Sequence, residues 1–153
     1  MRYFEKISFE QFKKDIKDDI NLYNEYKLPC RDSRKTAGYD FSLIEDVEIA
    51  PGQILKIPTG IKSHFDDDEM LLLAVRSSTG IKYNIRLCNQ IGIVDADYYN
   101  NESNEGHMWF KIQNEGDKVV KFSKGGAIIQ GVFLKYLTTD SDNRLDKNRT
   151  SDY

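Results

Sequence analysis

The sequence predicts an all-β domain with a helix added at its N-terminus. From Cys30 onward, short apolar runs alternate with turn signals roughly every eight to twelve residues, as in β-sandwiches and barrels. Residues 9–23 instead place apolar side chains at helical spacing. The length of 153 residues fits one domain with a sizeable core. We therefore expect a single β domain carrying one helical extension.

The N-terminal helix is predicted by a repeat of apolar residues three or four positions apart. These residues are Phe9, Phe12, Ile16, Ile20 and Tyr23. Ser8 followed by Gln11 forms a capping box, and Ile7 can staple onto Phe12. Pro29 prevents any continuation of the helix. Residues 1–28 are thus expected to form a helical extension that packs its apolar face on the main domain.

The β domain is expected over residues 29–137. The predicted strands are Val47–Ile49, Ile54–Ile57, Met70–Val75, Trp109–Ile112, Lys118–Phe122 and Ala127–Leu137. Residues rich in Gly, Pro and Asp separate them, as expected for turns. Residues 138–153 contain almost nothing apolar, so this tail is expected to be mobile when no ligand is bound.

Composition excludes several classes of protein. A net charge of -3 argues against a nucleic-acid binder, although a local cluster of donors can still bind a small anion. Cys30 and Cys88 are the only cysteines, which favours a reducing cytoplasm over a disulfide scaffold. No Cys/His spacing suits zinc, so any metal should be a hard cation bound by oxygen. The longest apolar run, Met70–Val75, is too short for a membrane span.

The segment Arg76-Ser77-Ser78-Thr79-Gly80 directly follows a predicted strand. A guanidinium, two hydroxyls and a glycine that lets the backbone approach closely together make a phosphate cradle. Alone, the same residues are also consistent with an ordinary polar turn.

Two aspartates follow the short apolar run that ends at Val94. Asp95 and Asp97 stand two positions apart, so on a strand they would share one face. Such a pair could hold hydrated Mg²⁺, or one carboxylate could act as a base. A regular strand would place Tyr98 on the opposite face. A solvated strand end is the alternative interpretation.

Four segments in order resemble the dUTPase family. They are Ala37–Asp40; Arg76, Ser77, Ser78, Gly80 and Lys82; Gly92–Tyr98; and a strand bearing Gln130. The resemblance covers nearly the whole chain from Ala37 onward. It implies the all-β dUTPase fold, a β-barrel or jelly-roll of short strands, and the N-terminal helix resembles an extension of some bacterial members.

The resemblance implies hydrolysis of dUTP to dUMP and pyrophosphate by water that attacks the α-phosphorus. Asp95 matches the general base, and Arg76, Ser77 and Ser78 match the residues that bind phosphate. Mg²⁺ would bridge the phosphates, with Asp40 and Gln130 touching it or the phosphates through water.

The resemblance also implies how the nucleoside is recognised. Tyr98 would stack under the deoxyribose, while Asn89 and the backbone of Ile93 and Val94 would line a uracil pocket. Family members of this size usually form homotrimers whose composite sites take one segment from each subunit. Nucleic acid and membrane are not expected as partners, and the sequence does not identify a further protein partner.

The fifth family segment is only partly matched. Arg149 and Tyr153 correspond to an arginine that reaches the terminal phosphate and an aromatic residue that covers the base. The intervening glycines are replaced by Thr150-Ser151-Asp152, so the tail should close less tightly.

Two alternative functions remain open. The related dCTP deaminases share the fold and an arginine-serine-serine segment, but their glutamate base has no counterpart in Gly106–Phe110. A dUTPase-like binding or regulatory module with weakened catalysis is the other alternative, against which the intact Arg76, Asp95 and Tyr98 argue.

Overall fold

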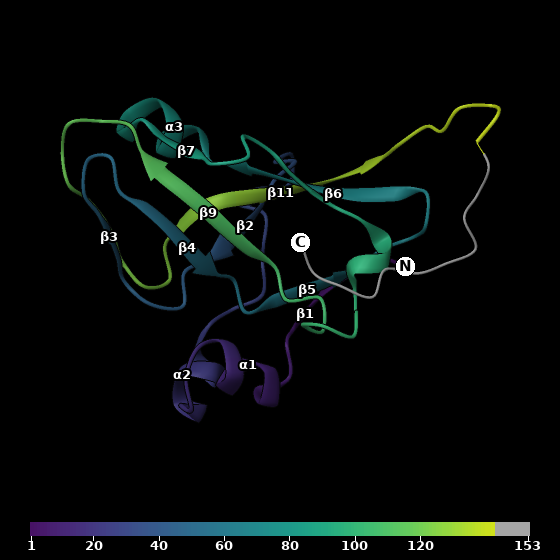
Figure 1. Ribbon diagram of the computed structural model, residues 1–153, viewed down its shortest axis with the longest axis horizontal. Helices are drawn as coiled ribbons and strands as arrows, with labels where there is room; N and C mark the ends of the chain where they lie inside the picture. The colour runs from purple at the N-terminus through teal and green to yellow at the C-terminus, as the bar shows by residue number, and fades with distance from the viewer. Residues whose placement is uncertain (143–153) are drawn as a thin grey trace.

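Eleven strands, three α-helices and one short 3₁₀ helix make up residues 1–142, the part of the chain that the computed structural model describes (Figure 1). In chain order they are β1 (Tyr3–Lys6), α1 (Phe9–Asp15), α2 (Ile20–Glu25), β2 (Tyr39–Ser42), β3 (Val47–Ile49), β4 (Ile54–Pro58), β5 (Ile61–His64), β6 (Glu69–Val75), α3 (Ser77–Tyr83), β7 (Ile85–Leu87), β8 (Gly92–Val94), η1 (Ala96–Tyr98), β9 (Trp109–Asn114), β10 (Val120–Phe122) and β11 (Ala127–Lys135). The predicted all-β class is confirmed.

The strands form two main sheets and two additional pairs, all antiparallel. One sheet has the order β2-β11-β6-β8 and the other the order β4-β9-β7. β1 pairs with β5, and β3 with β10. The loop of residues 88–91 that joins β7 to β8 therefore links the two main sheets. Apolar side chains that alternate along the strands, such as Leu71 and Leu73 of β6, fill the core.

The predicted strands correspond to six of these elements, with small shifts at their ends. β10 begins at Val120 rather than Lys118, and β11 ends at Lys135 rather than Leu137. β2, β5, β7 and β8 were not predicted as separate strands, because each has only three or four residues.

The single helix predicted over residues 9–23 is wrong. α1 ends at Asp15, and α2 starts afresh because the Asp19 side chain accepts a hydrogen bond from the Leu22 N–H (3.0 Å) and caps it. The Ser8 cap is confirmed, since its hydroxyl accepts from the Gln11 N–H (3.1 Å).

The rest of the N-terminal segment packs on the β domain. β1 pairs with β5 along its whole length, so the segment begins with a strand that the sequence pattern did not reveal. The apolar face of α1 and α2 is buried through Phe12 and Leu22, and these helices form the lowest part of the molecule in Figure 1.

The predictions about a membrane span and about the C-terminal tail can be compared with the structure only within residues 1–142. No helix within residues 1–142 is long and apolar enough to cross a membrane. Of the tail, only residues 138–142 are described, and Arg149 and Tyr153 lie outside them.

Candidate functional site

Three of the predicted phosphate and metal residues meet at one end of the four-stranded sheet, where β6 ends. Gln130 on β11 lies opposite Asp40 of β2 on one side and Ala74 of β6 on the other. Arg76 directly follows β6, and its Nε lies 3.1 Å from Asp40 Oδ1. Gln130 Nε2 donates to the carbonyl of Val75 (3.3 Å). We call Asp40, Arg76 and Gln130 the polar cluster.

Gly38 is required for the position of Gln130. A Cβ added at Gly38 would lie 2.0 Å from Gln130 Oε1, closer than any two such atoms can approach. The glycine of the Ala37–Asp40 segment therefore lets the amide pack against the backbone beside Asp40. The glycine was visible in the sequence, but its contact across the sheet was not.

The segment Arg76–Ser78 begins a helix and does not form the isolated polar turn. Arg76 is the N-cap of α3, and its N–H donates to the carbonyl of Ile128 (2.9 Å). Thr79 Oγ1 donates to the same carbonyl (3.1 Å), which fixes the first turn on β11. Ser77 and Ser78 are exposed. Their hydroxyls and the N–H groups of a first helical turn are available donors for an anion.

The electrostatics of the polar cluster centre on Asp40. Burial raises the pKa of the Asp40 carboxyl above its ordinary value, and Asp32 adds to the rise, while Arg76 lowers this pKa in part. A further cation beside Asp40 would stabilise its charged form. A carboxylate and an amide oxygen are ligands that suit Mg²⁺, so these residues fit the predicted metal.

The predicted uracil residues line a pocket of about 400 Å³. Asn89, in the loop between β7 and β8, and Ile93 and Val94 of β8 form one side of it. The other side comes from β4 and β9, through Lys56, Trp109 and Lys111, with Leu73 and Leu87 also lining it. The volume suits one nucleoside rather than a larger ligand.

The β4 and β9 side of this pocket was missed by the sequence analysis. Lys56 and Lys111 lie directly opposite each other in the β4–β9 ladder, and Lys56 Nζ is 4.8 Å from the centre of the Trp109 ring. Within residues 1–142 neither lysine forms an ion pair with a carboxylate. Only the pairing of strands distant in sequence brings these side chains to the pocket.

Asp95 directly follows Val94 of the pocket wall and is exposed. The expectation that Asp95 and Asp97 share one strand face is wrong, because β8 ends at Val94 and residues 96–98 form a 3₁₀ helix. The Tyr98 N–H donates to the carbonyl of Asp95 (3.1 Å), which closes this turn.

Tyr98 lies in the interior behind Asp95, with 2% of its surface exposed. Its hydroxyl donates to the carbonyl of His107 (2.8 Å) and accepts from Asn104 Nδ2 (2.8 Å). The side chain thus fixes the turn that carries Asp95. The stacking of Tyr98 under a deoxyribose stays a prediction.

The polar cluster and the Asp95 pocket lie at opposite ends of β6. Val94 pairs with Leu71 near the start of the strand, whereas Arg76 follows its last residue, Val75. Arg76 lies five positions after Leu71, about 17 Å at the usual rise of a strand. One chain therefore does not bring Arg76 to Asp95.

The chain is thus an all-β domain with a cluster of polar side chains at one end of a sheet and a separate pocket of about 400 Å³. The sequence model of the dUTPase family matches residues 24–152. The chain therefore belongs to the dUTPase family, as the four segments predicted.

Individual relatives agree with this assignment. The chain is 42% identical over 120 residues to the deoxyuridine 5'-triphosphate nucleotidohydrolase of Lactococcus lactis, covering 78% of this chain and 80% of the relative. The enzyme of that name from Photorhabdus laumondii is 33% identical over 76% of this chain and 74% of the relative.

Solved structures show the same fold. The crystal structure of dUTPase from Streptococcus mutans has a TM-score of 0.71 and 38% sequence identity, with 90% of this chain and 98% of that chain covered. A mutant dUTPase from phage phi11 of S. aureus, described with a structural Mg(II) ion, has a TM-score of 0.69 at 17% identity, with 96% of this chain and 97% of that chain covered. The second likeness concerns the fold alone.

Proposed function

We propose that this chain hydrolyses dUTP to dUMP and pyrophosphate, with Asp95 as the general base. Family membership supports the reaction. The observation that carries the assignment of the base is the position of Asp95, an exposed carboxylate directly after β8, which lines the pocket. A carboxylate there can take a proton from water held beside the α-phosphorus of a bound nucleotide.

The residues of β8 and of the preceding loop that line the pocket would recognise the base. Uracil presents carbonyl oxygens and an N–H, which the backbone of Ile93 and Val94 and the amide of Asn89 can complement. Cytosine carries an amino group where uracil has an oxygen, so a donor placed for uracil faces a second donor. A mismatch of this kind discriminates strongly because it leaves buried polar groups unpaired.

The polar cluster and the start of α3 would bind the phosphates. Arg76 offers a guanidinium, and Ser77 and Ser78 add hydroxyl and backbone N–H donors. Asp40 and Gln130 would hold Mg²⁺ or the phosphates through water, and the ion would neutralise phosphate charge. Arg149 and Tyr153, outside the described residues, would contact the terminal phosphate and the base.

The separation of the two groups along β6 supports a composite site. An α-phosphorus beside Asp95 lies only a few ångströms from the β- and γ-phosphates, far less than the length of β6. Arg76 of the same chain cannot serve that nucleotide. We therefore assign the phosphate donors of each site to a second subunit of a homotrimer.

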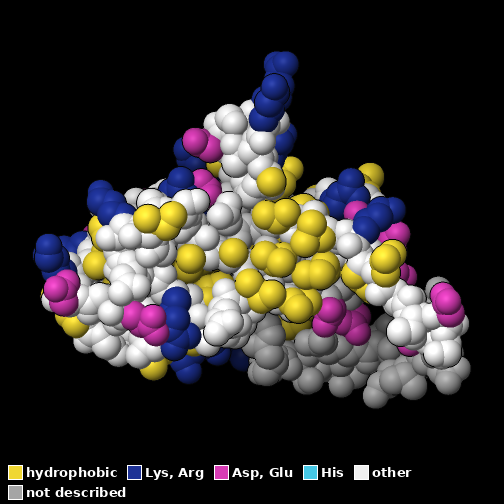
Figure 2. Space-filling view, turned by 90° about the horizontal axis from the view of Figure 1, so that it is seen from above, with side chains coloured by type: hydrophobic (Ala, Val, Ile, Leu, Met, Phe, Trp, Pro, Cys, Tyr) yellow, Lys and Arg dark blue, Asp and Glu magenta, His cyan; other side chains and the backbone are white. Residues whose placement is uncertain are grey.

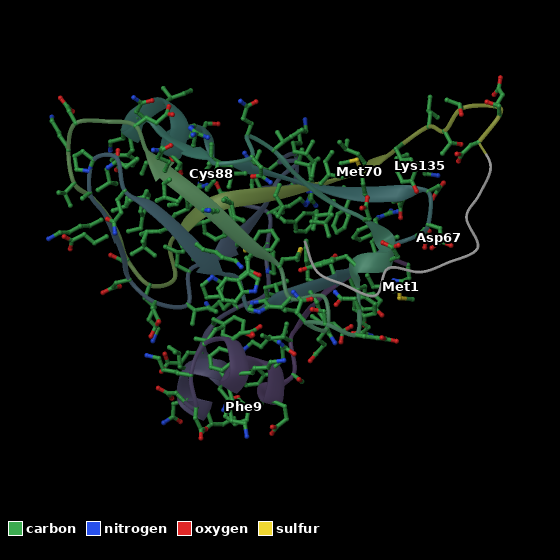
Figure 3. The ribbon with its side chains drawn as sticks, in the orientation of Figure 1. Met1, Phe9, Asp67, Met70, Cys88 and Lys135 are labelled. Carbon is green, nitrogen blue, oxygen red and sulfur yellow. The ribbon has the colours of Figure 1, made fainter. Side chains whose placement is uncertain are left out.

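An apolar face on the four-stranded sheet supports this assembly. Its side chains alternate with the buried ones on β6, β8 and β11, and they are Met70, Leu72, Ile93, Val132 and Leu134. Figure 2 looks onto this side from above and shows hydrophobic side chains gathered over its middle. Met70 and Lys135 lie close together on neighbouring strands at one end of it (Figure 3). A contiguous apolar patch of this kind is typical of a surface that another subunit covers.

Replacing Leu134 with Asp should break the trimer. Leu134 is 43% exposed in the single chain, so Leu134→Asp places a charge at the interface without burying it in the monomer. Light scattering coupled to gel filtration should give a monomer mass with an unchanged circular dichroism spectrum, and dUTP turnover should fall about 100-fold. Ile54→Asp, at 48% exposure on β4, is the matched control and should stay trimeric. A trimeric, active Leu134→Asp variant would remove this face from the interface.

A nucleotide panel tests the reaction itself. Pyrophosphate release should be fast with dUTP and slow with dTTP, dCTP and UTP, and chelation of Mg²⁺ should suppress it. Ammonia release from dCTP would favour the deaminase alternative instead. Binding of dUTP without release of pyrophosphate would favour the regulatory module. Equal turnover of dUTP and dCTP would contradict the proposed recognition of uracil.

A further inference from the structure

The loop that begins at the proposed base is tied to the N-terminal module at three points. We define the Asp95 loop as residues 95–108, between β8 and β9, and the N-terminal module as residues 3–26, which include β1, α1 and α2. The Tyr99 hydroxyl donates to Glu5, Ser8 donates to Glu105, and Asp15 accepts from His107. Figure 1 shows α1 and α2 of this module beneath the paired strands β1 and β5.

The Asp15–His107 contact is the most buried of the three. The His107 side chain has no exposed surface, and its Nδ1 lies 2.6 Å from Asp15 Oδ2. Its Nε2 accepts a hydrogen bond from the Gly60 N–H (2.9 Å). Because Nε2 is an acceptor, the ring is neutral and Nδ1–H donates to Asp15. Burial lowers the pKa of His107, in agreement with a neutral ring.

Short contacts connect His107 to Asp95. The His107 carbonyl accepts from the Tyr98 hydroxyl (2.8 Å) and from Asn104 Nδ2 (3.1 Å). The Tyr98 N–H in turn donates to the carbonyl of Asp95. A displacement of His107 is therefore passed through one buried ring to the turn that carries the base.

Glu105 forms the second connection. It accepts from the Ser8 N–H (2.7 Å), the Ser8 hydroxyl (2.6 Å) and Lys62 Nζ (2.9 Å). The loop reverses here with positive φ at Glu105 (64°) and Gly106 (87°). A Cβ at Gly106 would lie 2.8 Å from the carbonyl of Tyr98, so the glycine lets the two parts of the loop meet.

We propose that the N-terminal module positions the general base Asp95, with Asp15 as a positioning residue that acts through His107 and Tyr98. This inference rests on the proposed function, because it assigns to the module a part in dUTP hydrolysis. The module does not touch the substrate. It restricts the Asp95 loop so that the carboxylate stays in line with the attacking water.

The test compares Asp15→Ala with Asp18→Ala, an exposed aspartate of the same module. Asp15→Ala should lower kcat for dUTP about 10-fold, because small misplacements of a catalytic group have large effects on rate. KM and the affinity for a nonhydrolysable dUTP analogue should be unchanged. Asp15→Asn keeps an oxygen that can accept from His107 Nδ1–H and should restore most of kcat. Amide exchange over residues 96–107 should quicken in Asp15→Ala only.

A variant at a second connection keeps the proposal testable if Asp15→Ala does not fold. Tyr99→Phe removes only the hydroxyl that donates to Glu5, and it should lower kcat with KM unchanged. Normal kcat in folded Asp15→Ala and in Tyr99→Phe would overturn the positioning role, while the wild-type turnover of dUTP would stand. A wild-type protein that does not hydrolyse dUTP would overturn the proposed function itself.

Discussion

The Asp95→Asn variant should lose about 10²–10⁴-fold in kcat for dUTP, because an amide of nearly the same shape cannot take a proton from water. The fold and the affinity for dUTP should be kept, since Asp95 is exposed and the pocket wall ends before it. Stopped-flow or coupled assays of pyrophosphate release, with a separate measurement of binding, distinguish loss of chemistry from loss of substrate.

Asp97→Asn is the matched control for this experiment. Asp97 is also exposed, lies two residues farther along and belongs to the 3₁₀ helix. The same chemical change there should leave kcat within a few-fold of the wild type. A large loss in Asp97→Asn together with normal turnover in Asp95→Asn would assign the base to the other carboxylate.

Mixing two inactive variants should restore activity. Arg76→Ala removes the phosphate donor and Asp95→Asn removes the base, so each homotrimer should turn over dUTP at least 100-fold more slowly than the wild type. If a site takes Arg76 and Asp95 from different subunits, one of the three sites in every trimer that contains both variants has both native residues, so about a third of the wild-type activity should return. Co-expression of differently tagged chains, followed by purification on both tags, would provide the mixed trimers for the assay.

The outcome of mixing follows from the distance that β6 places between Arg76 and Asp95 of one chain. A site built within one chain would gain nothing, because every subunit in the mixture lacks one of the two residues. Asp95→Asn mixed with Asp95→Ala is the control and should stay inactive in either case. Mixed trimers without activity would contradict the composite site. The roles of Arg76 and Asp95 would then be decided by the activities of the two single variants alone.

Local features of the fold could be predicted from the sequence. Apolar alternation predicted most strands, and Ser8 predicted the helix start, because each signal lies within a few residues. The end of α1 could not be predicted in this way, since apolar periodicity continues through Ile16 and Ile20. The side chain of Asp19 decides the break by capping a second helix. The pairing of β1 with β5 joins segments too distant for any local pattern.

The sequence predicted which segments contribute to the candidate site, but not how these segments are arranged in space. The Asp40, Arg76 and Gln130 segments were each recognisable, and their meeting follows from the register of β2, β11 and β6. The distance between Arg76 and Asp95 also follows from register, which the sequence does not state. A regular strand would have placed Tyr98 on the face opposite Asp97, whereas residues 96–98 form a 3₁₀ helix and the Tyr98 side chain is buried.

The segment between β7 and β8 joins the two main sheets beside the pocket. β7 belongs to the three-stranded sheet and β8 to the four-stranded sheet, and side chains of both sheets line the cavity. A nucleoside bound there as proposed would therefore contact both sheets at once. Because a ligand that binds only the folded state stabilises that state, occupancy of the pocket would favour the folded arrangement of the two sheets.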